Sequence, residues 1–158
     1  MIPFVRTESR NIYRIPFDGE PNVQPAPFHY ESFWQRGAVD FALPIGTPIL
    51  AAADGIVTSI QDGNGEGRLE QRFLTHSNTI VILHKYGESS YYVHLRKGIV
   101  VKWGQKVKEG DLIGYSGISG FASYPHLHFA LMGYTGLLTI PPRFQVNGDV
   151  KVLVSPRE

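Results

Sequence analysis

The sequence has 158 residues, no cysteine and a formal net charge of only +1. The length favours a single domain over residues 1–158, the lack of cysteine excludes disulfides and thiolate metal sites, and the low charge without a basic block argues against a nucleic-acid partner. No apolar run approaches the ~18–20 residues of a membrane span, and residues 1–10 lack the apolar core of a signal peptide, so we expect a protein not exported by that route or a mature or trimmed form.

In chain order, the first predicted element is an arm over residues 1–36, rich in proline and in aromatic residues near its end. This composition is typical of an extended arm and loop laid over a sheet. Two similar segments follow, GTPILAAADGIV at residues 46–57 and GQKVKEGDLIGYSG at residues 104–117. Each places a glycine before an apolar hairpin with a D-G or G-D turn, and such paired hairpins can wrap around each other. The similarity is too short to define a sequence repeat.

Four runs of β-branched and aromatic residues have the length of strands. They are NTIVILH (78–84), SYYVHL (90–95), GIVVKW (98–103) and HLHFALM (126–132), with turn-like stretches such as KYGE, RKG and SGISG between them. The one predicted helix is short, Glu66–His76, and residues 133–158 are typical of closing strands and a frayed tail. We therefore expect an all-β, mostly antiparallel domain with a sandwich or flattened-barrel core.

The stretch YPHLHFAL contains the histidine pair His126 and His128, separated by one residue. Side chains alternate along a strand, so the two imidazoles should share one face while Leu127 and Phe129 face the core. One imidazole could then bind a metal while the other transfers protons. The alternative is that one histidine packs in the core and the other is solvated.

Three more residues are candidates for the same site. Asp40 lies on a strand between alanines, where a carboxylate is costly to bury unless it is paired or bound to a metal, although it could also cap a turn. His94, on a strand with Tyr92 on the same face, is either a site residue or a core histidine. His29 follows a Pro-Phe pair upstream of Asp40.

Together these residues offer two imidazole nitrogens and one carboxylate for a single Zn²⁺ ion, with a fourth position open to water. A metal held in this way lowers the pKa of bound water towards ~7 and polarises a carbonyl. The remaining histidines could act as base and as oxyanion stabiliser. Aromatic residues could line an adjacent groove or pack in the core; these are Tyr91, Tyr92, Tyr115, Phe121 and Tyr124.

At this point the sequence resembles the lysostaphin-like, LytM-type zinc metallopeptidases, which cut peptide bonds in peptidoglycan. The similar stretches are AVDFALPIGTPILAAADGIV, NTIVILHKYG, YYVHL, VVKWGQKVKEGDLIGYSGISG and YPHLHFAL, in the family's order. The resemblance implies a two-sheet antiparallel β fold with a central groove and a catalytic core over residues 38–132. It also implies a peptidoglycan peptide as substrate and a location outside the cell or in its envelope. The oligomeric state is not encoded in these motifs, and a monomer is the default expectation.

The resemblance also assigns roles to residues. Asp40 and His128 match the family's zinc ligands, His126 its general base, and His94 the second catalytic histidine, which positions water or stabilises the tetrahedral intermediate. The family's usual histidine four residues before the aspartate is replaced by Arg36, which stays protonated and cannot ligate zinc. We expect His29 to return beside Asp40 as the third ligand.

Other readings remain open at the level of sequence. Without His29 the site would be incomplete, and the domain would be a degenerate LytM-like module that binds or regulates cell-wall enzymes. A lipoyl- or biotinyl-type carrier domain needs a lysine at the tip of a hairpin, and the corresponding stretch AAADGIV has none. A serine hydrolase is disfavoured because GYSGI lacks the second glycine of a nucleophile elbow. The structural role is favoured for the last two histidines, His76 and His84.

Overall fold

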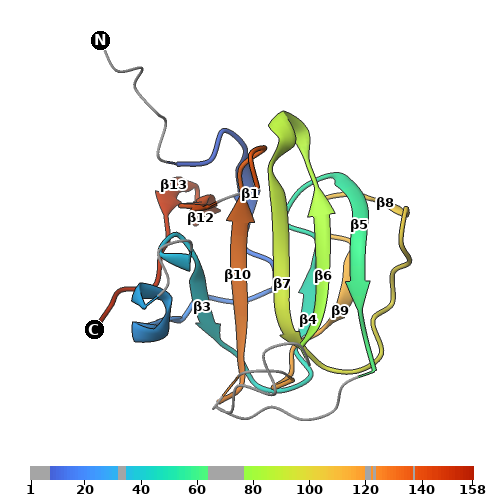
Figure 1. Cartoon of the computed structure of the whole chain (residues 1–158), viewed down its shortest axis with the longest axis horizontal. Helices are drawn as coiled ribbons and strands as arrows, with labels where there is room; N and C mark the ends of the chain where they lie inside the picture. The colour runs from blue at the N-terminus through green and yellow to red at the C-terminus, as the bar shows by residue number, and fades with distance from the viewer. Residues whose placement is uncertain (1–7, 32–34, 64–76, 120–121, 123, 137) are drawn as a thin grey trace.

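An eight-stranded antiparallel sheet forms the centre of the protein in a computed structural model (Figure 1). The structure describes residues 8–31, 35–63, 77–119, 122, 124–136 and 138–158. In spatial order the strands are β2 (Val23–Gln24), β3 (Val39–Ala42), β10 (His126–Met132), β7 (Ser89–Leu95), β6 (Asn78–Leu83), β5 (Gly55–Gln61) and β8 (Lys106–Val107), and β11 (Thr139–Ile140) also pairs with β10.

Two small sheets complete the fold. They are β1 (Ile12–Arg14), β12 (Arg143–Val146) and β13 (Asp149–Val152), and the pair β4 (Pro48–Leu50) and β9 (Leu112–Tyr115). β1 and β12 run parallel, which departs from the antiparallel expectation. The described residues contain no α-helix but include the 3-10 turns η1 (Pro27–Tyr30) and η4 (Lys85–Gly87), and none of their helices could cross a lipid bilayer. The all-β prediction is confirmed, and the sheets do not close into a barrel. The predicted helix Glu66–His76 lies outside the described residues.

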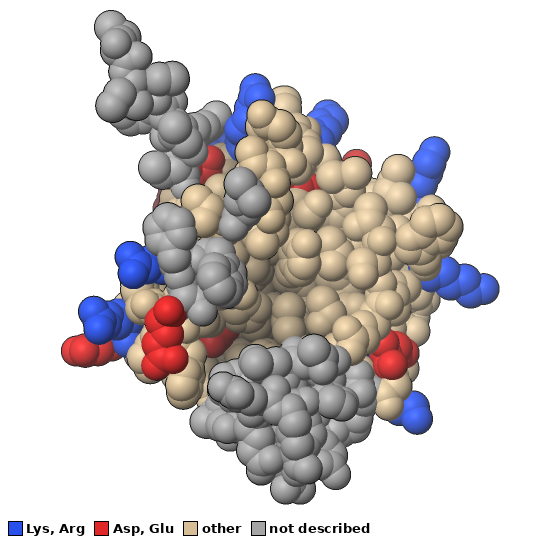
Figure 2. Space-filling model, viewed as in Figure 1, with Lys and Arg blue, Asp and Glu red and all other residues tan. Residues whose placement is uncertain are grey.

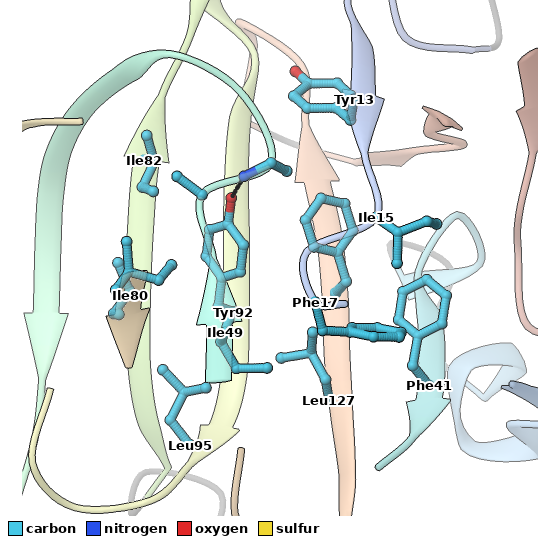
Figure 3. Packing of buried hydrophobic residues seen from close by; sticks show 14 of the residues in the cluster. Tyr13, Ile15, Phe17, Phe41, Ile49, Ile80, Ile82, Tyr92, Leu95 and Leu127 are labelled. Carbon is cyan, nitrogen blue, oxygen red and sulfur yellow. Dashed lines mark hydrogen bonds between the residues drawn. The ribbon is translucent and has the colours of Figure 1, made fainter. Parts of the chain in front are cut away.

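The core lies on one face of the large sheet and follows from side-chain alternation. Ile80 and Ile82 of β6, Tyr92 of β7, and Leu127 and Phe129 of β10 are all fully buried. Figure 3 shows this packing, with the Tyr92 hydroxyl accepting a hydrogen bond from a backbone N–H of the segment after β4. The opposite face of the large sheet is therefore available for a site.

That outer face is poor in charge. The central strands β5, β6, β7 and β10 contain no lysine, arginine, aspartate or glutamate. Figure 2 shows the same feature, because the blue and red side chains lie around the rim while the middle of the face is tan. Charged groups near the sheet's outer face therefore come from the ends of these strands or from other elements.

The two similar hairpin segments pair with each other, as their sequences predict. β4 pairs with β9, and β5 pairs with β8. The prediction of a strand at residues 98–103 is wrong. The backbone N–H groups of Gly98 and Ile99 donate to the Asp62 carboxylate, and Gly98 and Gly104 both have positive φ, so the segment leaves the extended conformation.

Candidate metal centre

Five residues singled out in the sequence come together beside one end of β10. The turn η1 supplies His29, β3 supplies Asp40, β7 supplies His94, and β10 supplies both His126 and His128. β10 lies between β3 and β7 in the sheet, so each neighbour can place a side chain next to the histidine pair. Segments that are far apart in the sequence therefore share one small region of the outer face.

The histidine pair lies as strand alternation predicts. Leu127 and Phe129 are fully buried in the core, so His126 and His128 project from the other face of β10. Asp40 is directly opposite His128 in the antiparallel register between β3 and β10. The side chains of directly opposed residues share a face, which brings the carboxylate to the imidazole.

The predicted orientation of His94 is wrong, and a β-bulge is the reason. Alternation would place His94 with Tyr92, which is buried in the core, but the register shifts so that Thr79 of β6 faces both Val93 and His94. His94 has φ = 66°, a left-handed conformation that costs about 1–3 kcal/mol in a residue other than glycine. The bulge turns its ring to the outer face, where its centroid lies 4.7 Å from that of His126.

His29 returns to Asp40 across the loop between β2 and β3, as expected. Pro27 begins the turn η1, where its fixed φ favours a helical start. The buried His29 side chain places Nε2 3.3 Å from Asp40 Oδ1. Arg36, at the position where the resembled family has a histidine, is exposed on a turn. The aspartate therefore has a nearby imidazole from this loop even though residue 36 supplies none.

His29, Asp40 and His128 form a group that could hold a metal ion. Their ligand atoms all lie within 4.8 Å of one another, and His128 Nδ1 is 2.9 Å from Asp40 Oδ1. Burial alone would raise the pKa of Asp40, but hydrogen bonds from His128 and His29 outweigh it and hold the pKa well below its usual range. Two imidazoles and one carboxylate are a donor set that zinc accepts while keeping a position open. The residues present therefore fit a zinc ion.

His126 is held in one tautomer by a backbone carbonyl. Its Nδ1 lies 2.8 Å from the carbonyl oxygen of Tyr124, which can only accept a hydrogen bond, so Nδ1 carries the proton. The Tyr124 ring stacks on His126 with centroids 4.5 Å apart. Burial lowers the pKa of His126, and its Nε2 lies 3.7 Å from Asp40 Oδ2. His126 is therefore a neutral imidazole whose unprotonated Nε2 lies near the Asp40 carboxylate.

His94 is held in the same way. Its Nδ1 lies 2.7 Å from the carbonyl oxygen of Ser119, which again requires a proton on Nδ1. Its own backbone N–H donates to the hydroxyl of Ser77. Burial, followed by the nearby His126 and His128, lowers the pKa of His94 to about 3. His94 is therefore neutral near pH 7, and its Nε2 can accept a hydrogen bond but not donate one.

The other sequence candidates have different positions. His84 lies at the opposite end of β6 and contacts the Asp54 carbonyl and the Ser90 hydroxyl through its two ring nitrogens, which fits the structural role expected for it. His76 and Phe121 lie outside the described residues. Tyr92 packs in the core, so it does not line a groove.

The sequence did not reveal the two residues whose backbone carbonyls orient His94 and His126. Ser119 and Tyr124 act on His94 and His126 through carbonyl oxygens, which every residue type possesses. No pattern of residue types could therefore have identified Ser119. A signal existed for Tyr124, because an aromatic residue directly before the Pro-His-Leu-His run lies close to the first histidine.

Known proteins that are similar to this chain are peptidases. A family model described as peptidase family M23 matches residues 35–138. The peptidoglycan DD-endopeptidase ShyA of Vibrio cholerae is 41% identical over 97 residues, covering 61% of this chain and 20% of ShyA. The glycyl-glycine endopeptidase ALE-1 of Staphylococcus capitis is 37% identical over 95 residues, covering 60% of this chain and 24% of ALE-1. The chain thus spans about a quarter or less of these curated relatives.

The match to one solved structure covers most of that structure. The catalytic domain of lysostaphin from Staphylococcus simulans superposes with a TM-score of 0.53 and 31% identity, covering 73% of this chain and 79% of that domain. The sequence match and the similarity in fold therefore concern the same kind of domain.

Proposed function

This chain belongs to peptidase family M23, and on that basis we propose that it is a zinc-dependent endopeptidase that hydrolyses peptide bonds in peptidoglycan. The names of two relatives, a peptidoglycan DD-endopeptidase and a glycyl-glycine endopeptidase, support this substrate class. Such a substrate implies that the protein acts outside the cell or in the envelope. The charge-poor outer face beside the site suits a peptide backbone without charged side chains.

The observation that carries the proposal is the convergence of three potential ligands with two further histidines. We propose that His29, Asp40 and His128 hold the zinc ion, since their ligand atoms lie within 4.8 Å of one another. When bound, zinc would lower the pKa of a coordinated water to about 7 and polarise the scissile carbonyl.

His126 is the proposed general base. Its Nδ1–H is engaged by the Tyr124 carbonyl, so the free lone pair on Nε2 can accept a proton from the attacking water. The same nitrogen can then return a proton to the leaving amine, which completes hydrolysis without a net change at the imidazole. The lowered pKa of His126 keeps the ring neutral and ready to accept a proton near neutral pH.

For His94 the hydrogen bonding favours one of the two roles that the resemblance allows. A neutral ring whose only N–H points at the Ser119 carbonyl has no donor left for a developing oxyanion. Its Nε2 can instead accept a hydrogen bond from the attacking water. We therefore propose that His94 and His126 orient the two protons of that water, and that His94 does not stabilise the oxyanion.

The proposal is tested by metal analysis together with a hydrolysis assay. Purified protein should contain about one zinc per chain, and it should release peptides and new amino termini from isolated peptidoglycan. A chelator should abolish release, and added Zn²⁺ should restore it. Parallel assays with glycine-bridged and directly cross-linked peptides would identify the bond. A folded protein that binds peptidoglycan, contains no zinc and cuts nothing would instead be the degenerate regulatory module.

A further inference from the structure

Ser155 contacts the strand that carries Asp40, although it lies outside the residues matched by the family model. Its side chain is fully buried. The backbone N–H of Asp40 donates to Ser155 Oγ over 2.7 Å, and the backbone N–H of Ser155 donates to the Ala38 carbonyl over 3.1 Å. Ser155 is thus hydrogen-bonded to the residues on both sides of Val39, the first residue of β3, and it lies 115 positions after Asp40 in the sequence.

The same short segment also contacts the turn that carries His29. The Tyr30 hydroxyl donates to the Ser155 carbonyl over 2.9 Å, and the Ala26 backbone N–H donates to the Pro156 carbonyl over 2.9 Å. These two bonds hold the turn η1 at both ends, through Ala26 just before it and Tyr30 at its end. Figure 1 shows the red C-terminal segment beside β3 and the blue turn.

We infer that Ser155 is a positioning residue for the metal centre, holding η1 and β3 together so that His29 and Asp40 stay within ligand distance. This inference rests on the proposed function. His29 lies in the connection between β2 and β3, and the bonds from this connection to Ser155 and Pro156 help to offset the conformational entropy that is lost when its residues are ordered. Ligands also have to be held within about 0.5 Å of the productive geometry by surrounding contacts.

The test compares two buried serines. Ser155→Ala removes the acceptor for the Asp40 N–H, while Ser9→Ala removes an equally buried hydroxyl that accepts the Arg143 N–H over 2.9 Å in the N-terminal segment. Zinc affinity is measured on folded protein by competition with a chelating dye, well below either unfolding temperature. Ser155→Ala should weaken zinc binding about 10–100-fold, the usual effect of losing a contact that orients a ligand. Ser9→Ala should destabilise the fold but leave zinc affinity unchanged.

A second pair of variants covers the case in which Ser155→Ala does not fold. Tyr30→Phe removes only the hydroxyl bond to the Ser155 carbonyl, and Tyr13→Phe removes a buried hydroxyl bond to Glu88 in a separate network. Only Tyr30→Phe should weaken zinc binding and alter the visible spectrum of the Co²⁺-substituted protein, which reports coordination geometry.

The outcomes separate the two proposals. If the wild-type protein binds no zinc, the proposed function fails. If the wild type binds zinc and the Ser155 and Tyr30 variants bind it as tightly as the wild type, or no more weakly than their control variants, the positioning role of Ser155 is overturned while the proposed function stands.

Discussion

Replacing His29 with alanine removes one of the three proposed zinc ligands. The lost group is a buried imidazole with Nε2 3.3 Å from Asp40 Oδ1. A four-ligand structural zinc site contributes about 10–16 kcal/mol near neutral pH, so one ligand accounts for about 2.5–4 kcal/mol. Because about 1.4 kcal/mol is a tenfold change in affinity, we expect the Kd for Zn²⁺ to rise by about 10²–10³-fold.

The assay is a chelator-competition titration at neutral pH, with circular dichroism to verify that each variant is folded. Arg36→Ala is the matched control from the same loop, since Arg36 is exposed on a turn and should not affect the Kd. A His29→Ala protein with wild-type zinc affinity would refute the assignment of His29 as a ligand.

Three further changes test other parts of the structure. His126→Ala should keep zinc bound but lower kcat about 10²–10⁴-fold in the peptide-release assay; an unchanged kcat would exclude it as the base. Burial lowers the pKa of His94 to about 3, so below pH 6.5 the unfolded chain binds a proton there that the native protein does not. The free energy of unfolding of the metal-free protein should therefore decrease as the pH is lowered below 6.5, by up to about 1.4 kcal/mol per pH unit from this residue. His94→Gln should flatten this dependence in urea titrations. An unaltered slope would show that His94 is not buried in its neutral form. Leu127→Ala, at a fully buried position, should cost about 2–5 kcal/mol of unfolding free energy by urea denaturation, with a smaller loss contradicting the packing described for β10.

Much of the fold was predictable because its strands follow simple alternation. The runs that became β6, β7 and β10 carry β-branched and aromatic residues over the length of a strand, and large apolar side chains on their inward face, such as Ile82, Tyr92 and Phe129, form the core. Residues 98–103 have the same composition but form no strand, because side-chain and turn contacts occupy their backbone. Composition does not reveal which partner a backbone N–H will find. The division into arm, core and closing strands stays a prediction.

In the candidate site, too, some features follow from the sequence and others only from the tertiary structure. The sequence by itself determined the face shared by His126 and His128, because alternation along a strand is local, and it excluded sulfur as a ligand because cysteine is absent. Only the tertiary structure decided that His29 approaches Asp40 across a long loop, that a bulge turns His94 outwards, and that Ser155 contacts both neighbouring segments. Each of these depends on contacts between distant parts of the chain, whose geometry is fixed by packing and backbone conformation and not by the order of residue types.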